Sequence, residues 1–304
     1  MVGRSTFTVL LVGCVLVLGS SLEAQDLGPQ FKKIKDGIYV QSAAPANSNC
    51  GIIVTSEGVV LIDSGFTPTD SRAVLKAVPQ LTPLPIRFLI DTETHPDHIT
   101  GHWLFSPPAM IISHTGGAEA ERKGFDPERI NNLIKQSPEM RDAAQGFKLV
   151  TPQIEYNEKM TLNMGDRTIE LLRLKNVHSE ADTAIWLPKE RVLFSASVAV
   201  PNSFNNIRSF VNIPDMLAAM KMMKALNPEV VIPGHGMPGT TQIFDDAERY
   251  FTLLVDRVGA MVREGKSLDQ IKQELRLPEY DNWIAKERIP SNIEAAYRAV
   301  KAGQ

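Results

Sequence analysis

The residues best suited to chemistry in this sequence form one short run, Glu93-Thr94-His95-Pro96-Asp97-His98, in a chain that has only six histidines. Imidazole nitrogens and carboxylate oxygens so close together on a sharp loop can point at a shared centre, and they are donors that bind zinc. A solvated polar turn would contain the same residue types, so the run alone leaves both interpretations open. Two more histidines, His178 and His235, follow further along the chain.

Apolar segments around this run predict the elements that position it. Residues 86–90 are typical of a buried strand that leads into the loop. Upstream, short β-type runs separated by turn residues predict an antiparallel meander, at 38–40, 52–54 and 58–62. A helix predicted at 68–78 lies between the meander and the buried strand, and a further strand is predicted at 110–112. This alternation indicates an α/β fold.

The rest of the chain continues this pattern and then becomes helical. Residues 116–145 are charged and mostly helical, and strands are predicted at 153–156, 159–162, 168–174, 183–187 and 192–194. A helix at 214–226 has Met216, Met220 and Met223 at helical spacing, which core packing explains better than a cofactor does. A last strand, 229–232, leads to His235.

The C-terminal part is predicted to be helical from residue 245, with capping-box patterns beginning at Ser267 and Ser291. No strong repeat or low-complexity linker interrupts the sequence. We therefore expect a catalytic domain over residues 30–240 and a helical C-terminal extension over 241–304 that packs on it.

The order and spacing of these motifs resemble the metallo-β-lactamase superfamily. Members have a His-x-His-x-Asp-His loop after a strand, preceded by an apolar strand that ends in Asp, and further histidines downstream. The corresponding features here are the loop at 93–98, the strand that ends at Asp63, and the later His178 and His235. The resemblance covers residues 37–240 and implies a four-layer αββα sandwich with a helical C-terminal extension.

The resemblance also implies a two-metal site. Its ligands would be Glu93, His95 and His178 for the first metal, and Asp97, His98 and His235 for the second. Glu93 stands where the family has the first histidine, and Ser197 where many members have a bridging Asp; one β-lactamase subclass also has this serine. Two zinc ions per chain are expected, although iron or manganese would also suit these donors.

Three residues are expected to support the ligands. Asp63 resembles the family's carboxylate that orients a ligand, although an Asp at a strand end also suits a plain turn. Asp182 is expected to do similar work near His178. Ser197 is expected to hydrogen-bond a water between the metals, or to be an ordinary buried serine. His102 is expected to be a core or surface histidine rather than a pocket residue.

The implied activity is hydrolysis of an ester, thioester, lactone or amide-type bond in a small molecule. Two nearby metals lower the pKa of a shared water and polarise the substrate oxygen, and Asp97 would orient the resulting metal-bound hydroxide as the catalytic carboxylate. A β-lactamase of the serine-containing two-zinc subclass is a second hypothesis, with Arg208 as a candidate partner for the substrate carboxylate, although a surface arginine explains this residue more simply. A di-iron redox protein would also use such a carboxylate, but flavodiiron members of the superfamily keep a bridging Asp and a flavodoxin-like domain, and neither is present in this sequence. A degenerate metal-binding protein without activity is the remaining hypothesis.

Composition and the N-terminus restrict partners and location. The net charge is only -3 and the sequence has no long run of Lys or Arg, so nucleic-acid binding is not expected. Arg4, the apolar stretch 9–18 and the small residues after it predict a signal peptide over residues 1–24.

That apolar stretch is too short to span a bilayer, so we expect a periplasmic or extracellular protein without stable membrane insertion. A lipoprotein anchored through Cys14 is the competing interpretation of this segment. If the signal peptide of residues 1–24 is removed, Cys50 would be the only remaining cysteine, expected as a small buried hydrophobe without a disulfide partner.

Overall fold

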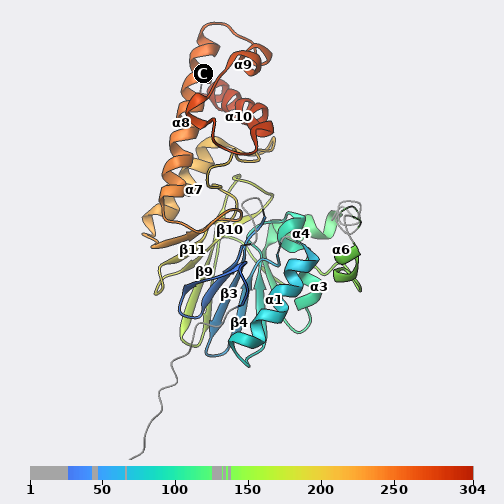
Figure 1. Cartoon of the computed structure of the whole chain (residues 1–304). Coiled ribbons are helices and arrows are strands. Elements are labelled where there is room, and N and C mark those ends of the chain that lie inside the picture. Colours follow the sequence, from blue (N-terminus) through green and yellow to red (C-terminus); the bar gives the residue numbers. More distant parts are fainter. Residues whose placement is uncertain are drawn as a thin grey trace, which may run out of the picture.

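The computed structural model describes residues 27–42, 47–65, 67–124, 132, 135 and 138–303. The predicted signal peptide and Cys14 lie outside the described residues, so export remains a prediction. Two β-sheets pack face to face with helices on their outer sides, and the C-terminal helices stack at one end of this sandwich (Figure 1). The predicted αββα architecture with a helical C-terminal region is confirmed.

The first sheet contains seven strands in sequence order. These are β1 (Phe31–Lys35), β2 (Ile38–Gln41), β3 (Cys50–Thr55), β4 (Gly58–Ile62), β5 (Ile86–Ile90), β6 (Met110–His114) and β7 (Ile154–Tyr156). The predicted antiparallel meander is confirmed as β2–β4. From β4 onward the neighbours are parallel, and Ile62 pairs with Ile90. The loops that follow β4 and β5 therefore begin side by side.

The second sheet contains five strands in the order β12-β11-β10-β9-β8. Their bounds are β8 (Lys159–Met164), β9 (Arg167–Leu174), β10 (Asp182–Leu187), β11 (Val192–Phe194) and β12 (Val230–Ile232). Phe194 at the end of β11 pairs in parallel with Ile232 at the end of β12. The segments that continue to Ser197 and His235 therefore leave the sheet at the same edge.

One group of helices flanks the first sheet, and a second group forms the C-terminal region (Figure 1). The first group is α1 (Pro68–Leu81), α2 (Pro96–Ile99), α3 (His102–Phe105), α4 (Thr115–Gly124) and α6 (Pro138–Ala143). The second is α7 (Ile213–Ala225), α8 (Gln242–Arg263), α9 (Leu268–Glu274) and α10 (Ile289–Ala302), with 3-10 turns η1 (Pro278–Tyr280) and η2 (Lys286–Arg288). Part of the predicted helical stretch 116–145 lies outside the described residues; α4 and α6 fall within it.

The two predicted capping boxes have different outcomes. The box at Ser267 is confirmed, because its side chain accepts from Gln270 N and the Gln270 side chain accepts from the Ser267 N–H. The prediction at Ser291 is wrong. α10 begins two residues earlier, at Ile289, so Ser291 lies within its first turn and its hydroxyl donates back to Arg288 O.

Alternation along the strands divides the core between two faces of the first sheet. Ile62 and Ile90 face the second sheet, where they pack with Phe194, while Leu61 and Leu89 pack on the opposite face against α1. Cys50 is fully buried on that outer face, as predicted.

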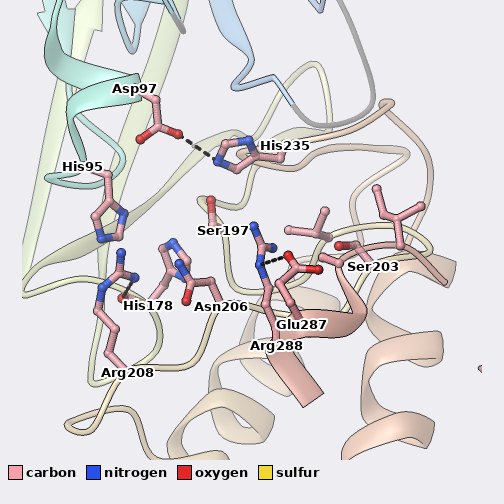
Figure 2. A pocket seen from close by; sticks show the side chains of 13 residues that line it. His95, Asp97, His178, Ser197, Ser203, Asn206, Arg208, His235, Glu287 and Arg288 are labelled. Carbon is pink, nitrogen blue, oxygen red and sulfur yellow. Dashed lines mark hydrogen bonds and ion pairs between the residues drawn. The ribbon is translucent and has the colours of Figure 1, made fainter. Parts of the chain in front are cut away.

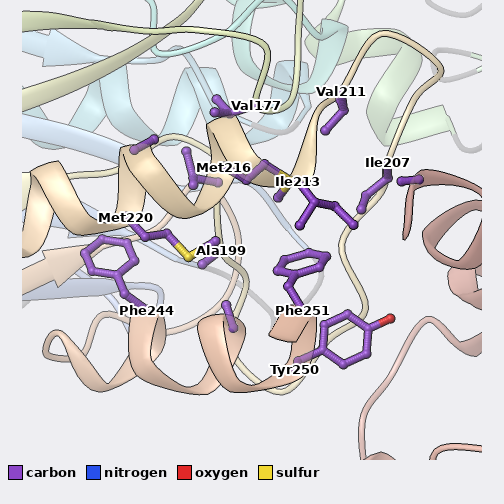
Figure 3. Close-up of a cluster of buried hydrophobic side chains, with 14 of the residues drawn as sticks. Val177, Ala199, Ile207, Val211, Ile213, Met216, Met220, Phe244, Tyr250 and Phe251 are labelled. Atoms are coloured by element: carbon purple, nitrogen blue, oxygen red, sulfur yellow. The ribbon is translucent and has the colours of Figure 1, made fainter. Parts of the chain in front are cut away.

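A third cluster joins the second sheet to the C-terminal helices. Met216 and Met220 on α7 lie opposite Phe244 and Phe251 on α8 (Figure 3). The predicted packing role of the methionines on α7 is confirmed, since Met216, Met220 and Met223 are all fully buried. Ile293 of α10 belongs to the same cluster, so the C-terminal helices share a core with the sandwich. No helix among the described residues is long and apolar enough to cross a membrane.

Candidate metal centre

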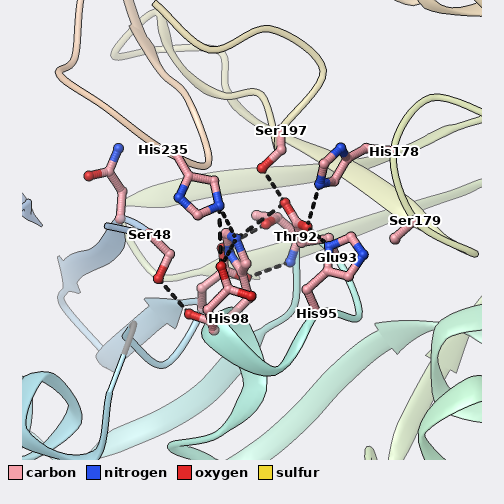
Figure 4. A network of polar contacts seen from close by, with 12 residues as sticks. Ser48, Thr92, Glu93, His95, His98, His178, Ser179, Ser197 and His235 are labelled. Carbon is pink, nitrogen blue, oxygen red and sulfur yellow. Dashed lines mark hydrogen bonds and ion pairs between the residues drawn. The ribbon is translucent and has the colours of Figure 1, made fainter. Parts of the chain in front are cut away.

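Six predicted ligand side chains meet at one edge of the sandwich, although they come from separate loops (Figure 4). Glu93 to His98 follow β5, His178 precedes β10, and His235 follows β12. The pairing of Thr183 N with Thr92 O, at 2.8 Å, connects the two sheets directly beside these loops. The edge reached by the carboxyl ends of parallel strands is a common place for ligand binding.

The first set, Glu93, His95 and His178, surrounds a buried carboxylate. Glu93 is 1% exposed, and one of its oxygens lies 3.2 Å from His178 Nε2 and also contacts His95 Nδ1. The rings of His95 and His178 meet edge to face with centroids 4.8 Å apart. One ligand atom from each residue lies within 4.8 Å of the others, so the three can approach a single ion.

The second set, Asp97, His98 and His235, lies next to the first. Nε2 of His98 is 3.2 Å from Nε2 of His235, and an Asp97 oxygen is 3.3 Å from the same His235 nitrogen. Because Glu93 also approaches His98 Nε2, at 3.3 Å, the two sets are contiguous. This arrangement fits two metals, since each set offers nitrogen and carboxylate donors aimed at one centre.

The carboxylates and histidines of the cluster shift one another's pKa values. Burial raises the pKa of Glu93, but His98, His178 and His95 together hold this pKa well below its ordinary value. Burial lowers the pKa of His98, but Glu93 and Asp63 raise it to about 10. The site therefore places carboxylates around His98, so that this histidine keeps its proton at neutral pH. A metal that bound here would displace that proton.

Asp63 and Asp182 lie behind the predicted ligands. Asp63 contacts His98 Nδ1 at 2.8 Å and accepts hydrogen bonds from Thr92 N and Oγ1, so the other ring nitrogen of His98 points into the site. Asp182 accepts from the backbone N–H groups of His178 and Ser179 and from the Ser179 hydroxyl. It therefore fixes the loop that presents His178.

Ser197 contacts Glu93 directly. Its hydroxyl donates to Glu93 Oε1, the carboxylate oxygen that does not face His178. Gly234 makes this position possible, because a Cβ there would lie 2.3 Å from Ser197 Oγ. Ser197 is fully buried and orients the glutamate of the first set.

A cavity of about 450 Å³ opens above the cluster, which is a volume typical of small-molecule sites (Figure 2). His95, Asp97, His178 and His235 line one side of it. Arg208, Asn206 and, from the C-terminal region, Arg288 also line it. The sequence suggested Arg208 as a pocket residue. It gave no signal for Arg288, which has no motif around it and lies 53 residues beyond His235.

A second buried ionisable cluster, Asp91, His102 and Glu121, was not predicted. His102 Nε2 lies 2.8 Å from Asp91 Oδ1 and its Nδ1 is 3.0 Å from Val150 O, so His102 is a paired core histidine. Glu121 is 3% exposed, and neither carboxylate oxygen has a hydrogen-bond partner among the described residues. Burial and the charge of Asp91 raise the pKa of Glu121 to about 8. None of these three residues lines the cavity.

Glu121→Gln should therefore change how stability depends on pH. A folded-state pKa near 8, against an ordinary 4.5, means that the folded chain binds the extra proton between these values. The wild-type free energy of unfolding should fall as the pH rises from 5 to 8 because of Glu121, by at most about 3–4 kcal/mol. The variant should lack this contribution. Denaturant unfolding at pH 5, 6, 7 and 8 measures it, and parallel curves for the two proteins would contradict the assignment.

Comparison with known proteins agrees with this fold and site. Residues 43–235 match the family model described as the metallo-beta-lactamase superfamily. The chain belongs to this superfamily of metal-dependent hydrolases.

Among its relatives is a linear primary-alkylsulfatase of Pseudomonas sp. (strain ATCC 19151), 23% identical, over 75% of this chain and 49% of that protein. A metallo-beta-lactamase type 2 of Bacillus sp. (strain 170) is 24% identical, over 67% of this chain and 71% of that protein. The solved sec-alkylsulfatase Pisa1 from Pseudomonas sp. superposes with a TM-score of 0.69 at 19% identity, covering 88% of this chain and 49% of that one. The chain thus spans about half the length of the alkylsulfatases it matches.

Proposed function

We propose that the protein is an exported hydrolase with two zinc ions, held by Glu93, His95 and His178 and by Asp97, His98 and His235. The observation that carries this proposal is the convergence of these six side chains, four of which, His95, Asp97, His178 and His235, line the 450 Å³ cavity. Residues 1–24 would direct export, and residues 30–240 with the C-terminal helices would form the enzyme.

The chain's own residues would position the reactants. Bound zinc would lower the pKa of a water and polarise the bond to be cleaved. Asp97 faces the cavity, and although burial raises its pKa, His98 and His235 bring that pKa below its ordinary value. An ionised Asp97 can accept a hydrogen bond from the attacking water and orient it. His98 and Glu93 are fully buried and hold the centre rigidly from below.

The substrate would be a small ester, thioester, lactone or amide. Sulfate esters and β-lactams enter as candidates, because relatives of this chain are named as an alkylsulfatase and as metallo-beta-lactamases. The β-lactam hypothesis has one specific observation in its favour, namely that Arg208 lines the cavity beside the ligands. A pocket that only binds a metal-held ligand is the non-enzymatic hypothesis.

A substrate panel tests the proposal. The full chain would be assayed with a 4-nitrophenyl ester, a lactone, a thioester, 4-nitrophenyl sulfate and a chromogenic cephalosporin, with and without dipicolinate. Turnover that dipicolinate abolishes and zinc restores is the expected result. Zinc-loaded protein that turns over none of these substrates would favour the non-enzymatic hypothesis.

Protein purified in the presence of zinc should contain about two zinc ions per chain, because the six side chains divide into two contiguous sets of three. Elemental analysis across a zinc titration measures this stoichiometry. Saturation at one ion per chain under excess zinc would contradict the two-metal assignment and leave Asp97, His98 and His235 as the doubtful set.

A further inference from the structure

We infer that Arg208 and Arg288 form an anion-binding wall beside the candidate metal ligands, and that the substrate carries a negatively charged group near the bond that is cleaved. This inference rests on the proposed hydrolytic function and specifies its substrate class. It also assigns part of the substrate pocket to the C-terminal helical region.

Arg208 is placed beside the loop that presents a ligand. Its Nη1 donates to His178 O at 3.3 Å, so the guanidinium stands beside the first ligand set (Figure 2). Its backbone carbonyl accepts from Arg298 on α10. Arg208 therefore connects the loop that carries His178 with the C-terminal helices.

Arg288 reaches the cavity from the C-terminal helical region. It lies at the end of η2, and its side chain extends toward Ser197 and His235 in Figure 2. The segment before it is fastened to the loop after β11 by the parallel bridge between Ser203 and Ile284, where Ile284 N donates to Asn202 O at 2.9 Å. The position of Arg288 is thus set by backbone pairing rather than by a loose surface loop.

A buried asparagine ties the two arginine-bearing segments together. Asn292 of α10 is fully buried, and its amide nitrogen donates to Asn205 O and to Arg288 O, both at 2.8 Å. Tyr250 of α8 donates to the Asn292 amide oxygen at 3.1 Å. The network holds residues 205–208 and Arg288 in a fixed relation before any substrate arrives. Such preorganisation favours a built binding wall over two incidental surface arginines.

The chemistry of this wall selects an anion. Guanidinium groups bind carboxylate and sulfate oxygens through parallel, charge-assisted hydrogen bonds, and Asn206 adds an amide to the same side of the cavity. Glu287 also lines the cavity, but its side chain is 74% exposed and its oxygen is 3.8 Å from Arg288 Nε. An ion pair this exposed is weak, so it competes little with a substrate anion.

Guanidinium groups bind both carboxylates and sulfates. A pair of matched substrates, one charged and one neutral, distinguishes this anion binding from hydrophobic binding of the acyl chain. 4-Nitrophenyl hexanoate and mono-4-nitrophenyl adipate have acyl chains of equal carbon number and differ by one terminal carboxylate. The readout is the ratio of kcat/KM for the charged ester over the neutral one. A chromogenic cephalosporin and 4-nitrophenyl sulfate then distinguish a carboxylate-bearing amide from a sulfate ester as the source of the anion.

The variants are Arg208→Gln, Arg288→Gln and Arg288→Lys, each assayed as the full zinc-loaded chain. Each Gln variant should lower the ratio roughly tenfold or more, which is the scale of one charged hydrogen bond. Arg288→Lys should restore part of it. Arg276→Gln removes the same charge from an exposed position beyond α9 and should leave the ratio unchanged.

A second measurement does not depend on a charged substrate. Inorganic sulfate should inhibit neutral-ester hydrolysis competitively, with an inhibition constant that rises in both Gln variants and not in Arg276→Gln. Folded Gln variants with an unchanged ratio and unchanged sulfate inhibition would overturn the inference. In that case, wild-type ester hydrolysis that requires zinc would still support the proposed function, so the two can fail separately.

Discussion

His95→Ala and His178→Ala should each lower kcat/KM for the best substrate more than a thousandfold, which is about 4 kcal/mol of transition-state stabilisation. Each change removes a nitrogen donor from the first ligand set, where the rings lie edge to face with centroids 4.8 Å apart. Glu93 and a single histidine would remain, and two donors hold zinc poorly in a site that needs three protein ligands. Steady-state assays at saturating zinc measure the effect.

The loss should come from chemistry and not from unfolding. The three apolar clusters that hold the sheets and helices together do not include either histidine, so circular dichroism and thermal unfolding should change little. His114→Asn is the matched control, because His114 lies outside both ligand sets and asparagine can still accept from Gly116 N. Full turnover by both alanine variants would place the reactive centre elsewhere.

Local sequence patterns predict most of the strands of this fold. The runs at 58–62 and 86–90 are apolar and bounded by turn residues, and they appear as β4 and β5 with these same bounds. β1 was not predicted, because three of its five residues are lysines and its pattern is only half-buried. Its position depends on antiparallel pairing with β2, which a local pattern does not reveal.

The candidate site and its surroundings also contain residues that local patterns predict and residues that they do not. The six predicted ligands have short motifs at strand ends, and the structure brings all six together. Glu121 lies in a charged helix where an acidic residue ordinarily faces solvent, and only the tertiary fold buries it against His102. Arg288 reaches the cavity because Ile284 pairs with the loop after β11, a contact between segments about 80 residues apart. Sequence periodicity contains no information on such contacts.

Glu93→Gln should remove most of the metal affinity of the first set, and hydrolysis should fall at least a hundredfold. The change preserves side-chain shape and one acceptor oxygen for the Ser197 hydroxyl. It replaces a negative carboxylate, whose oxygen lies 3.2 Å from His178 Nε2, with a neutral amide that is a poor zinc ligand. Zinc affinity measured by competition with a chromogenic chelator, together with kcat/KM at saturating zinc, checks both effects.

Glu121→Gln is the matched control for Glu93→Gln, because it neutralises another buried glutamate, 3% exposed, that belongs to neither ligand set. Neutralising Glu121 should leave zinc affinity and turnover close to wild type, since its carboxylate contacts His102 at 3.7 Å and does not line the cavity. If only Glu93→Gln loses zinc affinity and turnover, the loss is due to the position of Glu93 among the predicted ligands, and not to the neutralisation of a buried glutamate in general. If Glu93→Gln kept wild-type zinc affinity and turnover, Glu93 would not be a ligand, and the first metal would be left with His95 and His178 alone.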